Sequence, residues 1–145
     1  MKANTVSLLL RAEAGLELAG ILAGYRWLHG SWSLFALLFL LPDLSMLGYL
    51  RGARTGAWAY NAAHTYSVPA VLAVVTWLIG GVIPSPLWLV WLGHIAFDRV
   101  LGYGLKQETG FGHTHLGWKG KDVTLPPEAT LRSRHHAAFA GAARA

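Results

Sequence analysis

Two ionisable residues interrupt an otherwise apolar stretch at residues 88–106, which reads WLVWLGHIAFDRVLGYGLK. His94 and Asp98 are four residues apart, so on a helix their side chains share one face. An imidazole beside a carboxylate is typical of a metal site or of an oriented acid–base pair. Because burying such groups among apolar residues is costly without a partner, the stretch predicts a polar site.

The first apolar stretch of the chain contributes two more carboxylates. Glu13 and Glu17 are also four residues apart and share one helical face. Gly20 and Gly24 continue this face, which predicts that a neighbouring backbone approaches the helix closely there.

The second and third apolar stretches add one candidate each. Asp43 follows Pro42, and proline kinks a helix, frees backbone carbonyls and can aim the next side chain inward. His64 lies in the third stretch, where Asn61 and Ser67 share its helical face. We expect Asn61 and Ser67 to support an imidazole ligand through hydrogen bonds.

These stretches are long enough to cross a lipid bilayer, although the first also carries Arg11 and Arg26. The chain is 54% hydrophobic and only 13% charged, which is too apolar for an ordinary soluble domain. We predict an all-α, four-transmembrane-helix bundle in residues 1–118, ending in a short cytoplasmic loop segment, and a basic, flexible cytoplasmic tail in residues 119–145. The predicted spans are about residues 5–28, 32–50, 57–79 and 86–106, joined by a tight turn at 29–31, a basic loop at 51–56 and an uncharged turn at 80–86.

The distribution of basic residues sets the orientation of these spans. With four crossings, most lysines and arginines fall on the side that holds both termini, whereas Arg26 lies near the opposite side. This bias predicts that both termini are cytoplasmic. Each span then brings its carboxylate or imidazole to one layer, on the order of 12–18 Å from the cytoplasmic surface.

The predicted cluster has the ligand chemistry of a metal site in a four-helix bundle. The chain has no cysteine, so the ligands are nitrogen and oxygen atoms. Without a cation, carboxylates gathered at low dielectric would repel one another. Two imidazoles favour zinc, with manganese, iron and magnesium as alternatives. The predicted metal ligands are Asp43, His64, His94 and Asp98. The predicted catalytic residues are Glu13 and Glu17, as general base or as ligands of a second ion, and Arg99, as a contact for phosphate.

The polar segment after the fourth stretch adds His113 and His115, which flank Thr114. Two histidines in this spacing chelate an ion only when the chain is extended, so we expect a lid or supporting role, or otherwise a loop on the membrane surface. For the buried candidates, the alternative to a functional site is polar packing between helices. Arg11 or Arg99 would then pair with the glutamates of the first stretch, or Arg99 would reach the membrane surface.

Four motifs resemble those of domain-of-unknown-function family 4260, which comprises small bacterial membrane proteins. They read LLPDLSMLGYL, YNAAHTYSVP, WLGHIAFDRVLGYGLK and TGFGHTHLG. The resemblance covers residues 13–117. It implies a multi-pass protein of the bacterial cytoplasmic (inner) membrane and does not imply an activity.

A more distant similarity is to the YdjM-type inner-membrane metal-dependent hydrolases. It rests on LPDL at residues 41–44, HTYS at residues 64–67 and HIAFD at residues 94–98. Ser45 and Tyr66 stand where that group has a second aspartate and a second histidine. We expect Glu13 and Glu17 to take the place of those two ligands.

The function predicted from these features is that of a membrane-embedded, divalent-metal-dependent hydrolase. Its substrate would be lipid-borne or amphipathic and would enter from the cytoplasmic leaflet, and the bilayer is its predicted partner. The alternatives are a protein that moves protons or metal ions through the same residues, and a structural or accessory membrane subunit. No aromatic and basic motif indicates nucleic acid, and the pattern leaves a homo-oligomer open.

Overall fold

The computed structural model describes residues 3–80, 86–108, 112–114 and 117–118, and these are mostly helical. This confirms the helical fold class. The helices are α1 (Ala3–Trp27), α2 (Trp32–Leu38), the 3₁₀-helix η1 (Leu41–Arg51), α3 (Ala53–Ala63), α4 (Ser67–Gly80) and α5 (Pro86–Leu101). Two short strands, β1 (His113–Thr114) and β2 (Gly117–Trp118), pair in antiparallel fashion.

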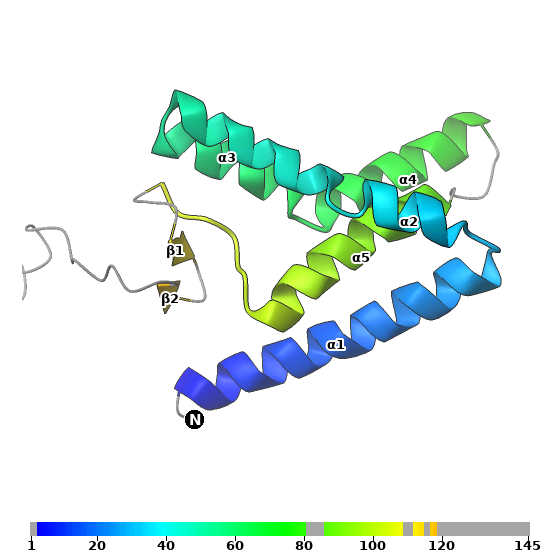
Figure 1. Cartoon of the computed structure of the whole chain (residues 1–145), viewed down its shortest axis with the longest axis horizontal. Coiled ribbons are helices and arrows are strands. Elements are labelled where there is room, and N and C mark those ends of the chain that lie inside the picture. Colours follow the sequence, from blue (N-terminus) through cyan, green and yellow to red (C-terminus); the bar gives the residue numbers. More distant parts are fainter. Residues whose placement is uncertain (1–2, 81–85, 109–111, 115–116, 119–145) are drawn as a thin grey trace, which may run out of the picture.

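Two antiparallel helix pairs make up most of the described structure (Figure 1). In the first pair α1 lies along α5, so that Arg11 near the start of α1 donates a hydrogen bond of 2.7 Å to the carbonyl of Val100 near the end of α5. At the opposite end of the pair, Gly24 faces the side chain of Leu89. In the second pair η1 lies against α3. The candidate site lies where α5 meets this second pair.

The second apolar stretch divides into two helical pieces, as its proline predicts. α2 begins after Ser31, whose side chain accepts a hydrogen bond from the backbone N–H of Leu34. Pro42 lies in the first turn of η1, where its missing N–H costs little. Asp43 follows it directly and is therefore placed at the first turn of η1.

A turn at one residue replaces the basic loop that we predicted at residues 51–56. Gly52 has a φ of 116°, which favours glycine, and α3 begins at the next residue. η1 and α3 then approach closely, because a side chain on Gly56 would overlap the ring of Tyr49. A Cβ atom on Gly48 would lie 2.9 Å from the Cβ of Ala59. Close approach therefore occurs at Gly48 and Gly56.

The prediction of close approach at two glycines of α1 was wrong. A Cβ atom added to Gly20 would meet no heavy atom within 4 Å, and one on Gly24 would make an ordinary contact of 3.6 Å with Leu89. The helical pattern correctly places these glycines on one face, but it does not tell which residues of the other helices fill the space opposite that face.

The third apolar stretch is two helices rather than one. α3 ends at Ala63 and α4 begins at Ser67, and the two helices bend by 48° at the break. Pro69 in the first turn of α4 explains the break, because it cannot donate a hydrogen bond to a preceding turn and would clash with it. Two side chains of α5 satisfy carbonyls at the break: Trp91 donates to Ala63 (2.7 Å) and Arg99 donates to His64 (2.9 Å).

α5 ends at Leu101, five residues earlier than predicted. Gly102 follows with a φ of 80°. Its N–H donates to the carbonyl of Arg99, and the N–H of Tyr103 donates to the carbonyl of Asp98 (2.9 and 2.8 Å). This is the Schellman arrangement, in which a glycine in the left-handed region stops a helix.

Large hydrophobic residues are mostly on the surface of the described structure, where the exposed ones far outnumber the buried ones. The segment Trp32–Arg51 has the length and composition of a membrane span, with a mean hydropathy of 1.7. α3 and α4 meet the same criteria if the bent pair is taken as one span. α1 carries several charges and α5 has only 16 residues, so these two helices do not. These features support membrane association, whereas the four-span topology stays a prediction. The predicted tail at 119–145 lies outside the described residues.

Candidate metal centre

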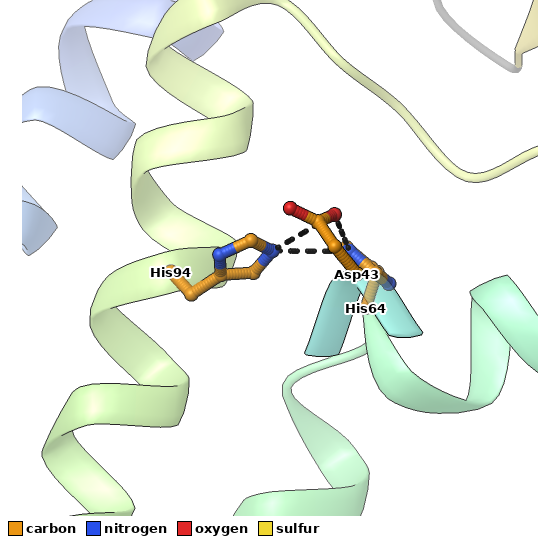
Figure 2. A group of neighbouring side chains, drawn as sticks. All are labelled: Asp43, His64 and His94. Carbon is orange, nitrogen blue, oxygen red and sulfur yellow. Dashed lines mark hydrogen bonds and ion pairs between the residues drawn. The ribbon is translucent and has the colours of Figure 1, made fainter. Parts of the chain in front are cut away.

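Three side chains from separate elements point toward one another, and each carries an atom that can bind a metal (Figure 2). They are Asp43 from η1, His64 from the break between α3 and α4, and His94 from α5. The Nε2 atoms of His64 and His94 are 3.1 Å apart. The Oδ1 atom of Asp43 is 3.4 Å from the first nitrogen and 3.6 Å from the second. The structure thus brings together three of the four predicted ligands.

The two imidazoles form the floor of the centre, and Asp43 lies at its opening. The side chains of His64 and His94 are 0% and 2% exposed, whereas that of Asp43 is 32% exposed. The ring of Tyr60 stacks on His64 at a centroid distance of 3.7 Å. The ring of Phe39 meets His94 edge-on at 5.3 Å. These aromatic rings pack against the buried imidazoles, and the partly exposed carboxylate is the part of the cluster that meets solvent.

A backbone carbonyl determines which nitrogen of His64 carries hydrogen. The Nδ1 atom lies 2.9 Å from the carbonyl oxygen of Tyr60, and a carbonyl can only accept a hydrogen bond. Nδ1 therefore bears the hydrogen, and in the neutral ring Nε2 presents its lone pair to His94 and Asp43. A carbonyl partner of this kind orients many metal-binding histidines.

His94 is held less firmly than His64. Its Nδ1 atom is buried and has no hydrogen-bond partner among the described residues. If its hydrogen is on Nε2, His94 donates to the lone pair of His64. If the hydrogen is on Nδ1, two lone pairs face each other at 3.1 Å, which requires a cation between them. An unpaired buried nitrogen remains in either case, at a cost of about 1–3 kcal/mol.

The distances agree with the geometry of a four-coordinate metal. Zinc binds histidine nitrogen and carboxylate oxygen at about 2.0–2.2 Å, so neighbouring ligand atoms of a tetrahedral site lie about 3.3–3.5 Å apart. The three distances between the candidate ligand atoms, 3.1, 3.4 and 3.6 Å, lie in or close to this range. A metal ion held by these two nitrogens and one oxygen would have three protein ligands, the number found in catalytic zinc sites, whereas structural sites have four.

Asp98 lies at the edge of the centre. Its Oδ2 atom is 3.7 Å from Nε2 of His64, and it accepts a hydrogen bond of 2.9 Å from the hydroxyl of Tyr60. It does not belong to the group of three whose ligand atoms all lie within 4.8 Å of one another. The geometry therefore places Asp98 beside the three candidate ligands, next to His64.

The three predicted catalytic residues lie elsewhere. Glu17 accepts a hydrogen bond of 2.9 Å from Tyr66, and Glu13 is exposed on α1 without a hydrogen bond or ion pair among the described residues. Arg99 donates to the carbonyls of His64 and Tyr103, at 2.9 and 2.7 Å. Its guanidinium thus fixes the backbone of a ligand.

The predicted supporting residues also have other contacts. Asn61 holds the chain after α5, because its side-chain amide donates to the carbonyl of Lys106 and accepts from its N–H. Ser67 is exposed, and its hydroxyl lies 3.2 Å from that of Thr65. Asn61 and Ser67 therefore do not support the imidazoles as predicted. The backbone of His113 belongs to β1. The side chain of His113 and the whole of His115 lie outside the part of the chain that the structure describes.

Tyr60 is the residue that the sequence analysis missed. It stacks on one ligand and donates a hydrogen bond to the carboxylate beside it. The available signal was its spacing, because Tyr60 precedes His64 by four residues and so lies one helical turn away on the same face.

Comparison with known proteins identifies a family and no individual relative. Residues 7–118 match the family described as a domain of unknown function (DUF4260), and this range contains the whole candidate centre. No curated protein and no solved structure matches the chain. The family expected from the sequence motifs is therefore confirmed.

Proposed function

Since the chain belongs to the family described as a domain of unknown function (DUF4260), we propose its function from the site alone: a membrane-embedded hydrolase that depends on one divalent metal ion. The observation that carries this proposal is the convergence of Asp43, His64 and His94 on one point, with ligand atoms 3.1–3.6 Å apart. The chemistry that such an ion supplies is the activation of a water molecule as a nucleophile near neutral pH.

The residues around the three ligands would divide the remaining work. Asp98 would act as the general base, because its carboxylate lies at the edge of the ligand group and is oriented by Tyr60. Arg99 would hold His64 in place through its carbonyl. Phe39 and the ring of Tyr60 would keep water away from the inner side of the imidazoles.

Zinc is the metal that fits this ligand set best. Two imidazoles and one carboxylate suit zinc better than magnesium, which prefers six oxygen ligands. Three protein ligands with one open position also match the catalytic zinc sites of hydrolases. Manganese and iron share these ligand types and are distinguished by the metal analysis below.

A lipid-borne ester is the substrate class that the surroundings favour. Many large apolar side chains are exposed, and a segment with the length and composition of a membrane span begins at Trp32, so the centre would be reached from within or beside the bilayer. The motifs LPDL at residues 41–44 and HIAFD at residues 94–98, which are similar to those of YdjM-type metal-dependent hydrolases, supply Asp43, His94 and Asp98. The proposal therefore includes hydrolysis and not metal binding alone.

A proton relay through the same residues is less well supported. The hydrogen on Nδ1 of His64 is directed at a backbone carbonyl, which accepts a hydrogen bond but does not pass a proton on. A relay along the two imidazoles would therefore end at His64.

Metal analysis of the purified protein tests whether the three candidate ligands bind a metal ion. Protein in detergent, prepared without chelator, is expected to hold about one zinc ion per chain by mass spectrometry. His94→Ala and Asp43→Asn are expected to lose it, because each removes one of three ligands. His29→Asn is the matched control: this exposed histidine has a φ of 54°, which asparagine tolerates. A wild-type protein that neither contains nor takes up zinc, manganese or iron would contradict the proposal.

The variant Asp98→Asn tests whether the protein hydrolyses esters with Asp98 as the general base. This variant keeps the shape of the side chain and the three ligands, so it is expected to retain metal while losing hydrolysis by about 10²–10⁴-fold. Hydrolysis would be followed with chromogenic phosphate and carboxylate esters of increasing alkyl-chain length. A variant that hydrolyses as fast as the wild type would show that Asp98 is not the base.

A further inference from the structure

We propose that the surface cavity between α1, α5 and the break that joins α3 to α4 binds an amphiphile with an alkyl chain and an amine head group. The cavity has a volume of about 400 Å³ and is lined by Glu17, Gly20, Ile21, Tyr66, Leu89 and Leu92. This inference does not depend on the metal ion, because none of these residues belongs to the group of three ligands.

The apolar part of the cavity suits an alkyl chain. Ile21 on α1 and Leu89 and Leu92 on α5 form its walls. Gly20 contributes free space, since a Cβ atom at this position would meet no heavy atom within 4 Å. A volume of 400 Å³ lies within the range of about 300–1,000 Å³ that is usual for small-molecule sites.

The polar end of the cavity carries a carboxylate without a cation. Tyr66, from the break between α3 and α4, donates a hydrogen bond of 2.9 Å to Oε2 of Glu17. Within the described ranges, no lysine, arginine or histidine forms an ion pair with Glu17, and its Oε1 atom accepts no hydrogen bond. Glu17 is exposed and the hydrogen of the tyrosine hydroxyl is already used, so a head group that lies here meets a negative charge and a free acceptor.

An amine suits the polar end of the cavity at Glu17 better than the other common head groups do. An ammonium group brings three donors and a positive charge, so it can pair with Glu17 while its alkyl chain lies against Leu89 and Leu92. A carboxylate or phosphate head group would be repelled by Glu17. An alcohol would donate one hydrogen bond but would bring no charge to pair with Glu17.

Binding of radiolabelled dodecylamine to the full-length protein in phosphatidylcholine nanodiscs tests the inference. Empty nanodiscs correct for partition into lipid. The wild type is expected to bind about one molecule per chain, and Glu17→Gln is expected to weaken binding by about tenfold or more, because hydrogen bonds to charged groups are the strong ones. Gly20→Leu is expected to weaken it similarly by filling the cavity. The matched control is Glu13→Gln, one turn away on the same helix and outside the cavity.

The outcomes separate this inference from the proposed hydrolase. Metal content is measured on the same samples, and retained metal in Glu17→Gln and Gly20→Leu shows that these variants are folded. No binding above empty nanodiscs would overturn the inference, as would binding that Glu17→Gln leaves unchanged or binding of dodecanol as tight as that of dodecylamine. Each of these results would leave the metal centre standing, and a protein without metal that binds dodecylamine would leave the cavity standing.

Discussion

At the scale of single residues, the two imidazoles of the centre are held to different degrees. His64 is fixed by a hydrogen bond from its ring to a carbonyl, by stacking on Tyr60, and by the contact of its own carbonyl with Arg99. His94 has an aromatic neighbour, Phe39, but no hydrogen bond at Nδ1. His64 is therefore the fixed reference around which the other two ligands are placed.

Tyr60→Phe separates the two roles of this tyrosine. Phenylalanine keeps the ring that stacks on His64 and removes the hydroxyl that orients Asp98. We expect hydrolysis to fall by about 10–100-fold, a loss typical of residues that orient a site, with metal content unchanged. Ester hydrolysis and metal analysis on one preparation check this, and loss of metal in Tyr60→Phe would mean that Asp98 is a ligand.

Helical spacing explains which residues of the centre could be predicted. His94 and Asp98, four residues apart on one helix, and Asp43 after a proline were found because local geometry alone decides where they lie. The partner of Glu17 could not be found in this way. It depends on how the break at Pro69 is held against α5 and α1, and hydrogen bonds between residues far apart in the sequence decide this.

At the scale of secondary-structure elements, the contact between η1 and α3 depends on Gly48 and Gly56. Gly56→Ala is expected to destabilise the protein by about 1–3 kcal/mol, because the added methyl group overlaps the ring of Tyr49. Gly20→Ala is the control, since its methyl group enters open space. A helical alanine is favoured over glycine, so this variant is expected to be unchanged or more stable by about 0.5–1 kcal/mol.

Unfolding of both variants by denaturant in the same detergent measures these free energies. Equal stability of Gly56→Ala and wild type would show that η1 and α3 can separate without cost. The sequence alone pointed to the glycines of α1 because a helical face is easily recognised. Which face meets a neighbour depends on the complementary residue, here Tyr49, and one sequence does not indicate this pairing.

At the scale of the whole molecule, the helical fold class follows from the composition and from the helical spacing of apolar and polar residues. The number of membrane crossings does not follow from them. α5 is short because Gly102 ends it, and α1 is charged, so length and hydropathy leave both undecided. One contact bears on the topology. Arg54 and Glu108 form an exposed ion pair of 3.5 Å, so the first turn of α3 and the segment after α5 lie at the same end of the molecule.

Single cysteines introduced into the chain test this topology, because it has none of its own. In right-side-out membrane vesicles, we expect Ser31→Cys to react with a membrane-impermeant maleimide. Arg54→Cys and Glu108→Cys are expected to react only in inside-out vesicles, because the basic residues place this side in the cytoplasm. Equal labelling of all three in one vesicle type would exclude four crossings.

The break between α3 and α4 changes the direction of the chain and places Tyr66 beside α1. A helix of 14 residues is about 21 Å long, so a turn of 48° moves the far end of α4 sideways by about 16 Å. A straight helix would keep the course of α3, whereas the bend places Tyr66 at the break, where it lines the cavity beside α1 and α5. Tyr66 is two residues from His64, so one short segment of the chain lines the cavity and also carries the buried imidazole of the candidate metal centre.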